Sequence, residues 1–364
     1  MKTYRNPPLV RGPGDEVVES ILREIMVRGD VLAEAKRRRN LICELAMKHE
    51  AARAAWYSGS VAHGTANSPL GDADCGVMVD RRFDEFRAFG PDAPGGGKGP
   101  EAFIQSFADW VLPRLVEADC PNATVDLTGN RAIKFMFNEP IELDALGLVD
   151  PYVDLIIGLD RRDAPGVWIP NRRRRGWDPA HPQRHTELMT TGAPDKLIVH
   201  RAHLLRLSKR AVKRDGLQTD LPAVCSWNLS ALGLAFIVER ARIAAALAQF
   251  LGAAAASIRR RLTDDPAGVA GKIKLPDGVT REYAAERLQM MSDVVGQAAA
   301  ATSVSEARWL LSQLFGVEID SIRTREKAAL THPVGDAIKR RDHAAIATAV
   351  AAVAPMKRTR DHGE

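Results

Sequence analysis

The sequence predicts an α+β fold, with a mixed sheet, flanking helices and a long N-terminal helix, followed by a helical unit. Three observations support this prediction. Apolar residues recur at helical spacing from about Asp15 to Ala55, short turn-bounded segments rich in β-formers follow up to residue 160, and helical patterns dominate from Pro194 onward. We therefore place a domain boundary near residue 195, which divides the chain into 1–195 and 196–364.

Length and composition are those of a soluble globular protein. The 364 residues are 45% hydrophobic and 27% charged, which fits one large domain or two apposed domains. The formal net charge of +5 and the pI near 9.1 favour anionic partners such as nucleotides, although nucleic acid is not required as a partner.

The four cysteines are far apart and form no CxxC pair. This spacing argues against a zinc site or a disulfide framework and suits a reducing cytosol. The sequence shows neither an apolar leader nor an uninterrupted membrane span, so we expect a cytoplasmic protein with no membrane association.

The N-terminal helical pattern predicts one long helix or two, with a break near Gly29. The basic run KRRR, Lys36 to Arg39, lies on it. We interpret this run as a solvated helix face, with a nucleic-acid contact as the alternative.

Between residues 89 and 185, helix and strand patterns alternate with loops. The segment FGPDAPGGGKGPE (89–101) is too rich in Gly and Pro for regular structure and lacks the features of a P-loop, so it is predicted to be a surface loop. A helix is expected over Ala102–Glu117, followed by strands in ATVDLTGN, RAIKFMFN and YVDLIIGLD.

The segment WIPNRRRRGWDPAHPQRH (168–185) is predicted to be loop-rich and strongly basic. Its arginines 172–175 offer a clamp for phosphates, but a solvated loop is the preferred interpretation. From Pro194 to Val353 we expect mostly helices, including Ala-rich pieces around 243–256 and 343–353, with a hydrophilic break at TDDPAGVAGKIKLPDG.

Two aspartates open a strand pattern in GSVAHGTANSPLGDADCGVMVD (59–80). Asp72 and Asp74 are two residues apart, so on a strand their side chains point to the same face. Burying two adjacent carboxylates is costly unless they share a cation. Carboxylate oxygens are good ligands for divalent metal ions, so such a pair suits a metal site. Upstream, Gly59 and Ser60 form a turn that can approach phosphate oxygens.

A third carboxylate is expected on a neighbouring strand. Asp154 lies inside the apolar run YVDLIIGLD and needs a partner, for which metal is the simplest choice. Asp126 in TVDLT is the rival candidate, ranked lower because the Thr and Gly residues around it indicate an edge or a turn. An isolated DxD is more often a turn or cap than a metal site, so the prediction depends on the order of the motifs.

That order, GS, then DxD, then a distant Asp in an apolar strand, resembles the DNA polymerase β-like nucleotidyltransferase superfamily. Within it, GSVAHGTANSPLGDAD is most similar to the bacterial cGAS/DncV-like nucleotidyltransferases (CD-NTases) and the oligoadenylate synthetases. Two more segments agree: WIPNRRRRGWDPAHPQRH and LLRLSKRAVKRDGLQTDLPAVCSWNLSALGL. The resemblance covers about residues 15–235 and implies an active site in a cleft between a polymerase β-like core and the helical domain.

The resemblance also implies site residues. Two Mg²⁺ or Mn²⁺ ions would be held by the three catalytic residues Asp72, Asp74 and Asp154. Five further residues would bind the nucleotide: Gly59, Ser60, Lys209, Ser226 and Trp227. For Lys209 a solvated lysine is an equal alternative, and for Trp227 a core aromatic is the more common one. His63, His181 and His185 are assigned no role.

The implied activity is transfer of a nucleoside monophosphate from an NTP to a nucleotide hydroxyl, giving a cyclic or linear oligonucleotide signal. The resemblance further implies a role in anti-phage (CBASS-type) signalling, with an activating ligand or regulatory protein and a downstream effector that recognises the product. Two alternatives remain open. The acceptor could instead be tRNA, a protein or a small molecule, as in toxin or resistance enzymes, or the chain could bind nucleotide or RNA without turnover.

Overall fold

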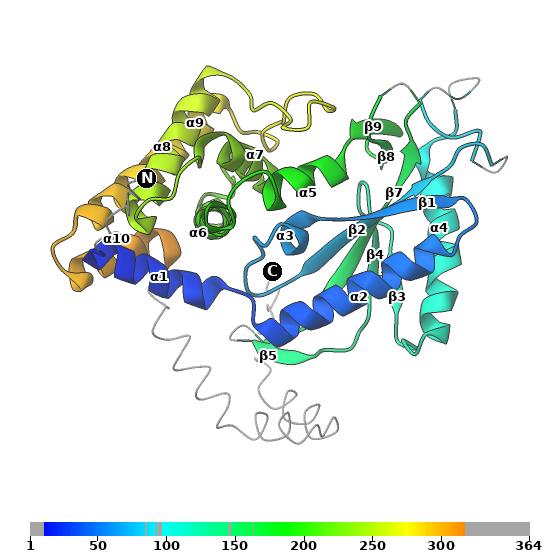
Figure 1. Cartoon of the computed structure of the whole chain (residues 1–364), viewed down its shortest axis with the longest axis horizontal. Helices are drawn as coiled ribbons and strands as arrows, with labels where there is room; N and C mark the ends of the chain where they lie inside the picture. Colours follow the sequence, from blue (N-terminus) through cyan, green and yellow to red (C-terminus); the bar gives the residue numbers. More distant parts are fainter. Residues whose placement is uncertain are drawn as a thin grey trace, which may run out of the picture.

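The computed structural model describes residues 11–83, 86–91, 93, 97–144, 147–162 and 164–316, which form a sheet unit beside a helical unit (Figure 1). The main sheet has seven strands: β1 (Ala52–Ser58), β2 (Asp72–Val79), β3 (Thr124–Asp126), β4 (Ile133–Met136), β7 (Tyr152–Asp160), β8 (Val167–Asn171) and β9 (Gly176–Ala180). Their order is β1-β2-β7-β4-β3, and the hairpin of β8 and β9 pairs with β7. Strands β2 and β7 run parallel and the other pairs antiparallel, so the predicted mixed sheet is confirmed.

A second, two-stranded sheet consists of β5 (Glu142–Asp144) and β6 (Gly147–Val149). Three of the predicted elements are confirmed with small changes at their ends. The helix expected at Ala102–Glu117 is α4 (Pro100–Glu117), the strand expected in RAIKFMFN is β4, and YVDLIIGLD is β7 along its whole length.

Helices α2 (Gly29–Met47) and α4 pack on one face of the sheet (Figure 1). Their apolar side chains form a core with alternate residues of β2 and β7, including Val77 and Leu155, both fully buried. Because successive side chains of a strand point to opposite faces, this packing turns the even-numbered residues of both strands away from the helices. The three predicted site aspartates are among them.

Two local predictions are wrong. The spacing of apolar residues predicts helix as far as Ala55, but α2 ends at Met47 and β1 begins at Ala52. The segment ARAAWYS forms a strand despite its three alanines because it pairs with β2. The segment 168–185, predicted to be loop-rich, contains the β8–β9 hairpin and the first residues of α5 (Pro182–Thr190). Pro179 is compatible with a strand because β9 is an edge strand, and Pro170 lies beyond the two β8 residues that pair with β7.

The basic run on α2 is only partly solvated, which corrects the interpretation of KRRR as a solvated face. Arg38 and Arg39 are buried, with 1% and 6% exposure. The Arg38 guanidinium forms an ion pair with Asp150 and donates to the Pro151 carbonyl at 2.9 Å, which satisfies the buried charge. Arg38 therefore fixes α2 against the start of β7, the strand that carries Asp154.

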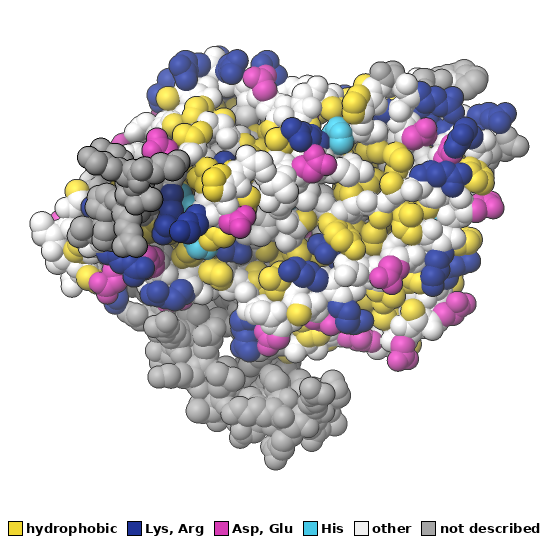
Figure 2. Space-filling view, in the orientation of Figure 1, with side chains coloured by type: hydrophobic (Ala, Val, Ile, Leu, Met, Phe, Trp, Pro, Cys, Tyr) yellow, Lys and Arg dark blue, Asp and Glu magenta, His cyan; other side chains and the backbone are white. Residues whose placement is uncertain are grey.

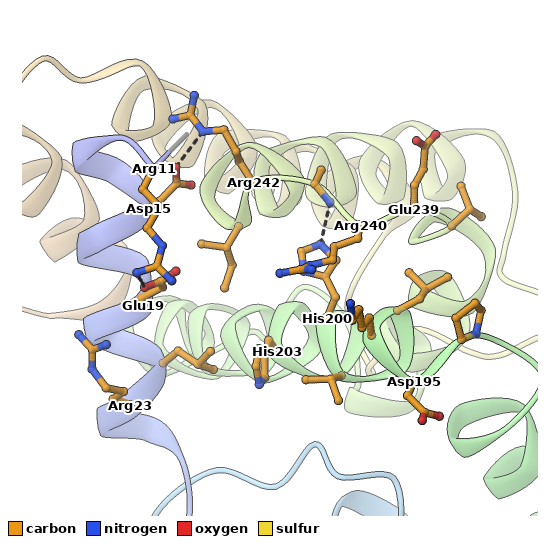
Figure 3. A pocket seen from close by; sticks show the side chains of 18 of the residues that line it. Arg11, Asp15, Glu19, Arg23, Asp195, His200, His203, Glu239, Arg240 and Arg242 are labelled. Atoms are coloured by element: carbon orange, nitrogen blue, oxygen red, sulfur yellow. Dashed lines mark hydrogen bonds and ion pairs between the residues drawn. The ribbon is translucent and has the colours of Figure 1, made fainter. Parts of the chain in front are cut away.

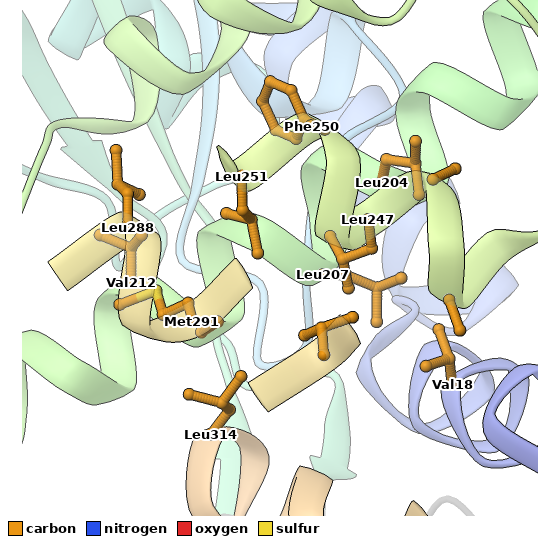
Figure 4. Packing of buried hydrophobic residues seen from close by; sticks show 14 of the residues in the cluster. Val18, Leu204, Leu207, Val212, Leu247, Phe250, Leu251, Leu288, Met291 and Leu314 are labelled. Carbon is orange, nitrogen blue, oxygen red and sulfur yellow. The ribbon is translucent and has the colours of Figure 1, made fainter. Parts of the chain in front are cut away.

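The second unit contains α6 (Asp195–Thr219), α7 (Ser226–Phe236), α8 (Ile243–Arg260), α9 (Arg281–Ala300) and α10 (Val304–Phe315). Apolar residues from several of these helices meet in one core, as Figure 4 shows for Leu204, Leu247 and Met291. The break predicted within this region is confirmed as the connection 261–280 between α8 and α9. The Ala-rich piece around 243–256 is α8, and the one around 343–353 lies outside the described residues.

The break predicted near Gly29 is confirmed, but it separates two helices that belong to different cores. Helix α1 (Pro13–Ile25) packs its apolar face, including Val18, into the helical core. The first helix therefore precedes the predicted boundary in the sequence but packs in the core of the helical unit. For the rest of the chain the division at residue 195 stays a prediction. Among the described residues, no helix is both long enough and apolar enough to cross a membrane.

Candidate active site

The three aspartates predicted to form the site lie together. Asp74 is the direct partner of Asp154 in the parallel pairing of β2 with β7, and Asp72 is two residues away on the same face. One carboxylate oxygen of each residue lies within 4.8 Å of the other two. Asp126, the rival candidate, lies on β3, where its carboxylate accepts from the Thr128 backbone N–H at 2.8 Å and takes no part in this cluster.

The carboxylates of the cluster repel one another. Burial, then the charges of Asp72 and Asp154, raise the pKa of Asp74 to about 7, and burial followed by Asp72 raises the pKa of Asp154 to about 6. A divalent cation would relieve this repulsion, and three carboxylates are the hard oxygen ligands that Mg²⁺ and Mn²⁺ take. The donor set therefore fits the predicted metal, whereas the count of two ions stays a prediction.

The Gly-Ser motif lies directly against the aspartates because β1 and β2 are neighbouring strands. Ser58 at the end of β1 pairs with Asp74, and helix α3 (Gly59–Ala62) starts at the next residue. Gly59 has a φ of +69°, and a Cβ there would lie 1.6 Å from the Asp74 Oδ2 atom. A glycine is therefore required both by the backbone conformation and by the close approach of the carboxylate. Ser60 follows it in the cleft wall.

Lys209 reaches the site from α6. Its ammonium group donates to the Thr65 hydroxyl at 2.8 Å. Burial lowers the pKa of Lys209 to about 8, against the opposing effect of Asp72 and Asp74, which favour its charged form. Lys209 is therefore a partly buried cation facing the carboxylates, and the alternative of a solvated surface lysine is excluded.

Ser226 and Trp227 begin helix α7 and also line the cleft. The Trp227 indole is half-buried and packs against the His185 imidazole, with ring centroids 4.3 Å apart and planes inclined by 40°. Trp227 is therefore part of the cleft wall rather than of the helical core.

The predicted nucleotide-binding residues line one cleft of about 860 Å³, together with Asp72 and Asp74. Ligand sites for small molecules have volumes of this order. A larger cavity of about 1500 Å³ lies between α1, α6 and residues 238–243 and contains none of the predicted site residues (Figure 3). We assign the chemistry to the smaller cleft because the carboxylates, the lysine and the aromatic side chain converge there.

Four further cleft residues were assigned no role from the sequence: His63, Thr65, Tyr152 and His185. Burial lowers the pKa of His63 to about 4, so its ring is neutral, and its Nε2 atom lies 3.1 Å from the Thr186 hydroxyl. The partners of these residues are distant in sequence, for example Thr65 with Lys209, so spacing gave no signal for them. The only hint for Thr65 was its place between the GS and DxD motifs.

Arginines 172–175 form the turn between β8 and β9 and do not line the cleft. Arg174 forms an ion pair with Asp178 in the same hairpin. This arrangement agrees with the preferred interpretation of a solvated basic loop. On the face seen in Figure 2, Lys and Arg side chains are interspersed with Asp and Glu and do not form a continuous track.

Comparison with known proteins gives matches in structure and none in sequence. No family model and no curated protein sequence matches the chain. Among solved structures, the chain is similar to the Bradyrhizobium diazoefficiens CD-NTase CdnG in complex with GTP, with a TM-score of 0.63, 16% identity, and 87% of this chain and 98% of that chain covered.

Two further structures are similar over most of their length. The Escherichia coli MS115-1 CdnC:HORMA-deltaN complex has a TM-score of 0.54 and 16% identity, covering 83% of this chain and 96% of that chain. The Vibrio cholerae DncV cyclic AMP-GMP synthase with the linear intermediate pppA(3′,5′)pG has a TM-score of 0.52 and 14% identity, covering 85% and 88%. The chain therefore has the polymerase β-like nucleotidyltransferase fold of the CD-NTases, as the resemblance implied.

Proposed function

We propose that this protein is a metal-dependent nucleotidyltransferase that transfers a nucleoside monophosphate from an NTP to a hydroxyl group of a second nucleotide. One observation carries the proposal. Asp72 and Asp74, whose carboxylates cluster with that of Asp154, line the same cleft as Lys209 and Trp227. Metal-ligating carboxylates, a cation and an aromatic side chain in one cleft are what a nucleoside triphosphate requires. The similar structures with bound GTP and with a linear dinucleotide support it.

In this proposal the three aspartates hold the metal. Divalent cations at this position would stabilise negative charge on the transferring phosphoryl group and lower the pKa of the attacking hydroxyl. Asp72 and Asp74 present their carboxylates from one strand, and Asp154 from the next, so the parallel pairing of β2 and β7 sets the geometry of the donor set. Asp154 is also the side chain proposed to assist proton removal.

The rest of the cleft binds the nucleotide. The Gly59–Ser60 turn lies beside Asp74, close enough for the Ser60 hydroxyl and backbone to contact the triphosphate. Lys209 supplies a positive charge from the opposite unit, and its partly buried position strengthens its attraction for phosphate. Ser226 provides a hydroxyl, and the Trp227 indole a surface on which a base stacks.

The reaction forms one bond and breaks one. The acceptor hydroxyl oxygen bonds to the α-phosphorus of the donor NTP, and the bond from that phosphorus to the oxygen bridging it to the β-phosphate breaks in line. The electron pair of the broken bond leaves with pyrophosphate, and the hydroxyl proton passes to a carboxylate or to solvent. No covalent intermediate with the protein is involved.

The product in this proposal is a cyclic or linear oligonucleotide that acts as a second messenger. One similar structure is a cyclic AMP-GMP synthase, and another contains a HORMA protein, which supports a nucleotide acceptor and a regulatory partner. A downstream effector that recognises the product, and a role in anti-phage signalling in the cytoplasm, remain expectations from the sequence resemblance. Transfer to tRNA, protein or a small molecule is the alternative.

The test is incubation of the purified protein with each α-labelled NTP, alone and in combination, and with Mg²⁺ or Mn²⁺. Phosphatase treatment then removes unreacted nucleotides and leaves cyclic products intact. We expect a phosphatase-resistant product that Asp74→Asn does not form. Label transferred instead to tRNA or protein in a lysate would establish the alternative acceptor, and label that stays in NTP in every mixture would contradict nucleotidyl transfer.

A further inference from the structure

His185 lines the cleft beside Trp227 and is hydrogen-bonded to Asp265 behind it, and the proposed reaction uses neither residue. We propose that His185 is a positioning residue for nucleotide binding, which is held by Asp265 and in turn fixes the Trp227 indole in the orientation needed to stack on the base of the NTP. This inference rests on the proposed function and deepens it, because it makes the connection 261–280 part of the nucleotide site.

The first link is the contact between the two rings. The His185 imidazole covers part of one side of the indole, with centroids 4.3 Å apart, and both residues line the cleft. Trp227 is the second residue of α7, near the end of the helix, where backbone packing alone restrains a side chain weakly. A neighbouring ring limits the indole to fewer rotamers, which lowers the entropy lost when a base stacks on it.

The second link is the hydrogen bond from His185 to Asp265. The His185 Nε2 atom lies 2.7 Å from the Asp265 carboxylate. Burial lowers the pKa of His185 although Asp265 opposes this, so the ring is neutral near pH 7. Burial alone would raise the pKa of Asp265, but hydrogen bonds from Ala270 and Val269 and the contact with His185 lower it, so the carboxylate is ionised. The His185 Nε2 atom therefore carries the proton and donates it.

The third link is the rigidity of the acceptor. The Asp265 side chain is 2% exposed. Its carboxylate accepts hydrogen bonds from the backbone N–H groups of three residues of the same connection, Ala267, Val269 and Ala270, at 3.3, 3.0 and 2.9 Å. These bonds close the backbone of 265–270 around the carboxylate, so they hold it in place independently of His185. His185 is thereby oriented by a group that is itself immobile.

An independent contact ties the same connection to α7. The Thr263 hydroxyl donates to the side-chain oxygen of Asn228 at 2.6 Å, and Asn228, the residue after Trp227, is completely buried. The connection thus holds α7 at the residue beside the indole and holds His185 against the indole itself. Movement of residues 261–280 would loosen both contacts together.

The experiment is a double-mutant cycle on the full chain with Mg²⁺. The dissociation constants of the non-reacting α,β-methylene analogues of ATP and GTP are measured by calorimetry for the wild type, His185→Ala, Trp227→Ala and the double variant. The kcat and KM for pyrophosphate release are measured with the natural NTPs. His185→Gln keeps a donor for Asp265 without the ring, and His185→Phe keeps the ring without the donor. His181→Asn, at the N-cap of the same helix and outside the cleft, is the matched control.

We expect His185→Ala and His185→Gln to weaken analogue binding about three- to tenfold, the size of an aromatic pair contact, with KM raised and kcat changed less than about twofold. His185→Phe keeps the ring contact but loses the hydrogen bond to Asp265, so it should recover only part of the affinity, and His181→Asn should match the wild type. In the Trp227→Ala background the substitution of His185 should have no further effect.

The inference is overturned if His185→Ala and His185→Gln bind the analogues as the wild type does. It is equally overturned if the loss is the same with and without Trp227, because His185 would then act independently of the indole. Should His185→Ala fail to fold, His185→Gln carries the same comparison. A wild type that binds none of the α,β-methylene analogues, with those of CTP and UTP included, contradicts the proposed function itself and the positioning role with it. The first two results leave the proposed function intact.

Discussion

Asp74 and Asp154 face each other across the only parallel pairing in the main sheet of the described residues, that of β2 with β7. In a parallel pair, partner residues point to the same face, so two strands 80 residues apart in sequence present their carboxylates side by side. Opposite this face, Val77 and Leu155 pack under α2 and α4. The core packing on one side therefore fixes the metal ligands on the other.

Replacing Asp154 by Asn should separate metal binding from folding. Without divalent metal, the melting temperature of Asp154→Asn should equal or exceed that of the wild type, because one repelling charge has been removed. Mg²⁺ at 100 times its Kd should stabilise the wild type by about 2.7 kcal/mol and so raise its melting temperature. The rise in melting temperature should be smaller for Asp154→Asn. Asp126→Asn, outside the cluster, should respond to Mg²⁺ as the wild type does. An equal response in all three proteins would place the metal elsewhere.

Two glycines in the same motif should respond differently to alanine. Gly59 and Gly64 both have positive φ angles, 69° and 64°, but a Cβ at Gly59 would overlap the Asp74 carboxylate whereas a Cβ at Gly64 would meet nothing within 4 Å. We expect Gly64→Ala to cost about 1–2 kcal/mol of stability from backbone strain and to retain activity. Gly59→Ala should lose at least about 100-fold in product formation, because it displaces a metal ligand. Comparable activities of the two variants would contradict the close approach of Gly59 to Asp74.

Lys209→Gln should weaken nucleotide binding more than a change at a nearby exposed lysine. Lys209 is partly buried and faces Asp72 and Asp74, whereas Lys213, one turn further along α6, lines the same cleft but is exposed. Lys209→Gln removes a charged hydrogen bond to phosphate, which contributes about 1.5–3 kcal/mol to binding. We therefore expect KM to rise about tenfold or more. Lys213→Gln should change KM by less than about threefold, since exposed charges are screened. Steady-state pyrophosphate release measures both, and equal effects would argue against a specific phosphate contact.

The site was predictable from the sequence to the extent that it depends on short-range pattern. The spacing of Asp72 and Asp74 puts both on one strand face, and the apolar run around Asp154 marks a buried strand. Strand β1 was missed because its alanines fit a helix, yet its pairing with β2 is what brings Gly59 to Asp74. Arg38 was interpreted as solvated because its partners, Asp150 and Pro151, are more than 100 residues away. The same holds for the pair of His185 and Asp265.

The helical unit should lose stability in acid through His200. Burial, then the charges of His203 and Arg240, lower the pKa of His200 to about 4, compared with about 6.5 in the unfolded chain. Between pH 6.5 and 4 the unfolded state binds more protons, so stability falls as the pH falls through this window. The loss is at most about 3.4 kcal/mol, because the pKa falls from 6.5 to about 4 and each pKa unit corresponds to about 1.4 kcal/mol.

His200→Gln tests this directly, because a glutamine oxygen can replace the His200 Nε2 atom as the acceptor for the Ala241 N–H. Urea unfolding at a series of pH values should give a shallower loss of stability for the variant than for the wild type below pH 6.5. The two proteins should have similar slopes above pH 7. Parallel curves throughout the acid range would show that His200 is not a source of the pH dependence.

The central claim, nucleotidyl transfer at the three aspartates, is tested most directly by pyrophosphate release. The wild-type protein is given all four NTPs with Mg²⁺ or Mn²⁺, and Asp74→Asn is run beside it under the same conditions. The account predicts metal-dependent pyrophosphate release by the wild type, matched by a phosphatase-resistant labelled product, and neither from the variant. Equal pyrophosphate release by the two proteins would contradict it, because the reaction would then not depend on the carboxylates that β2 and β7 bring together.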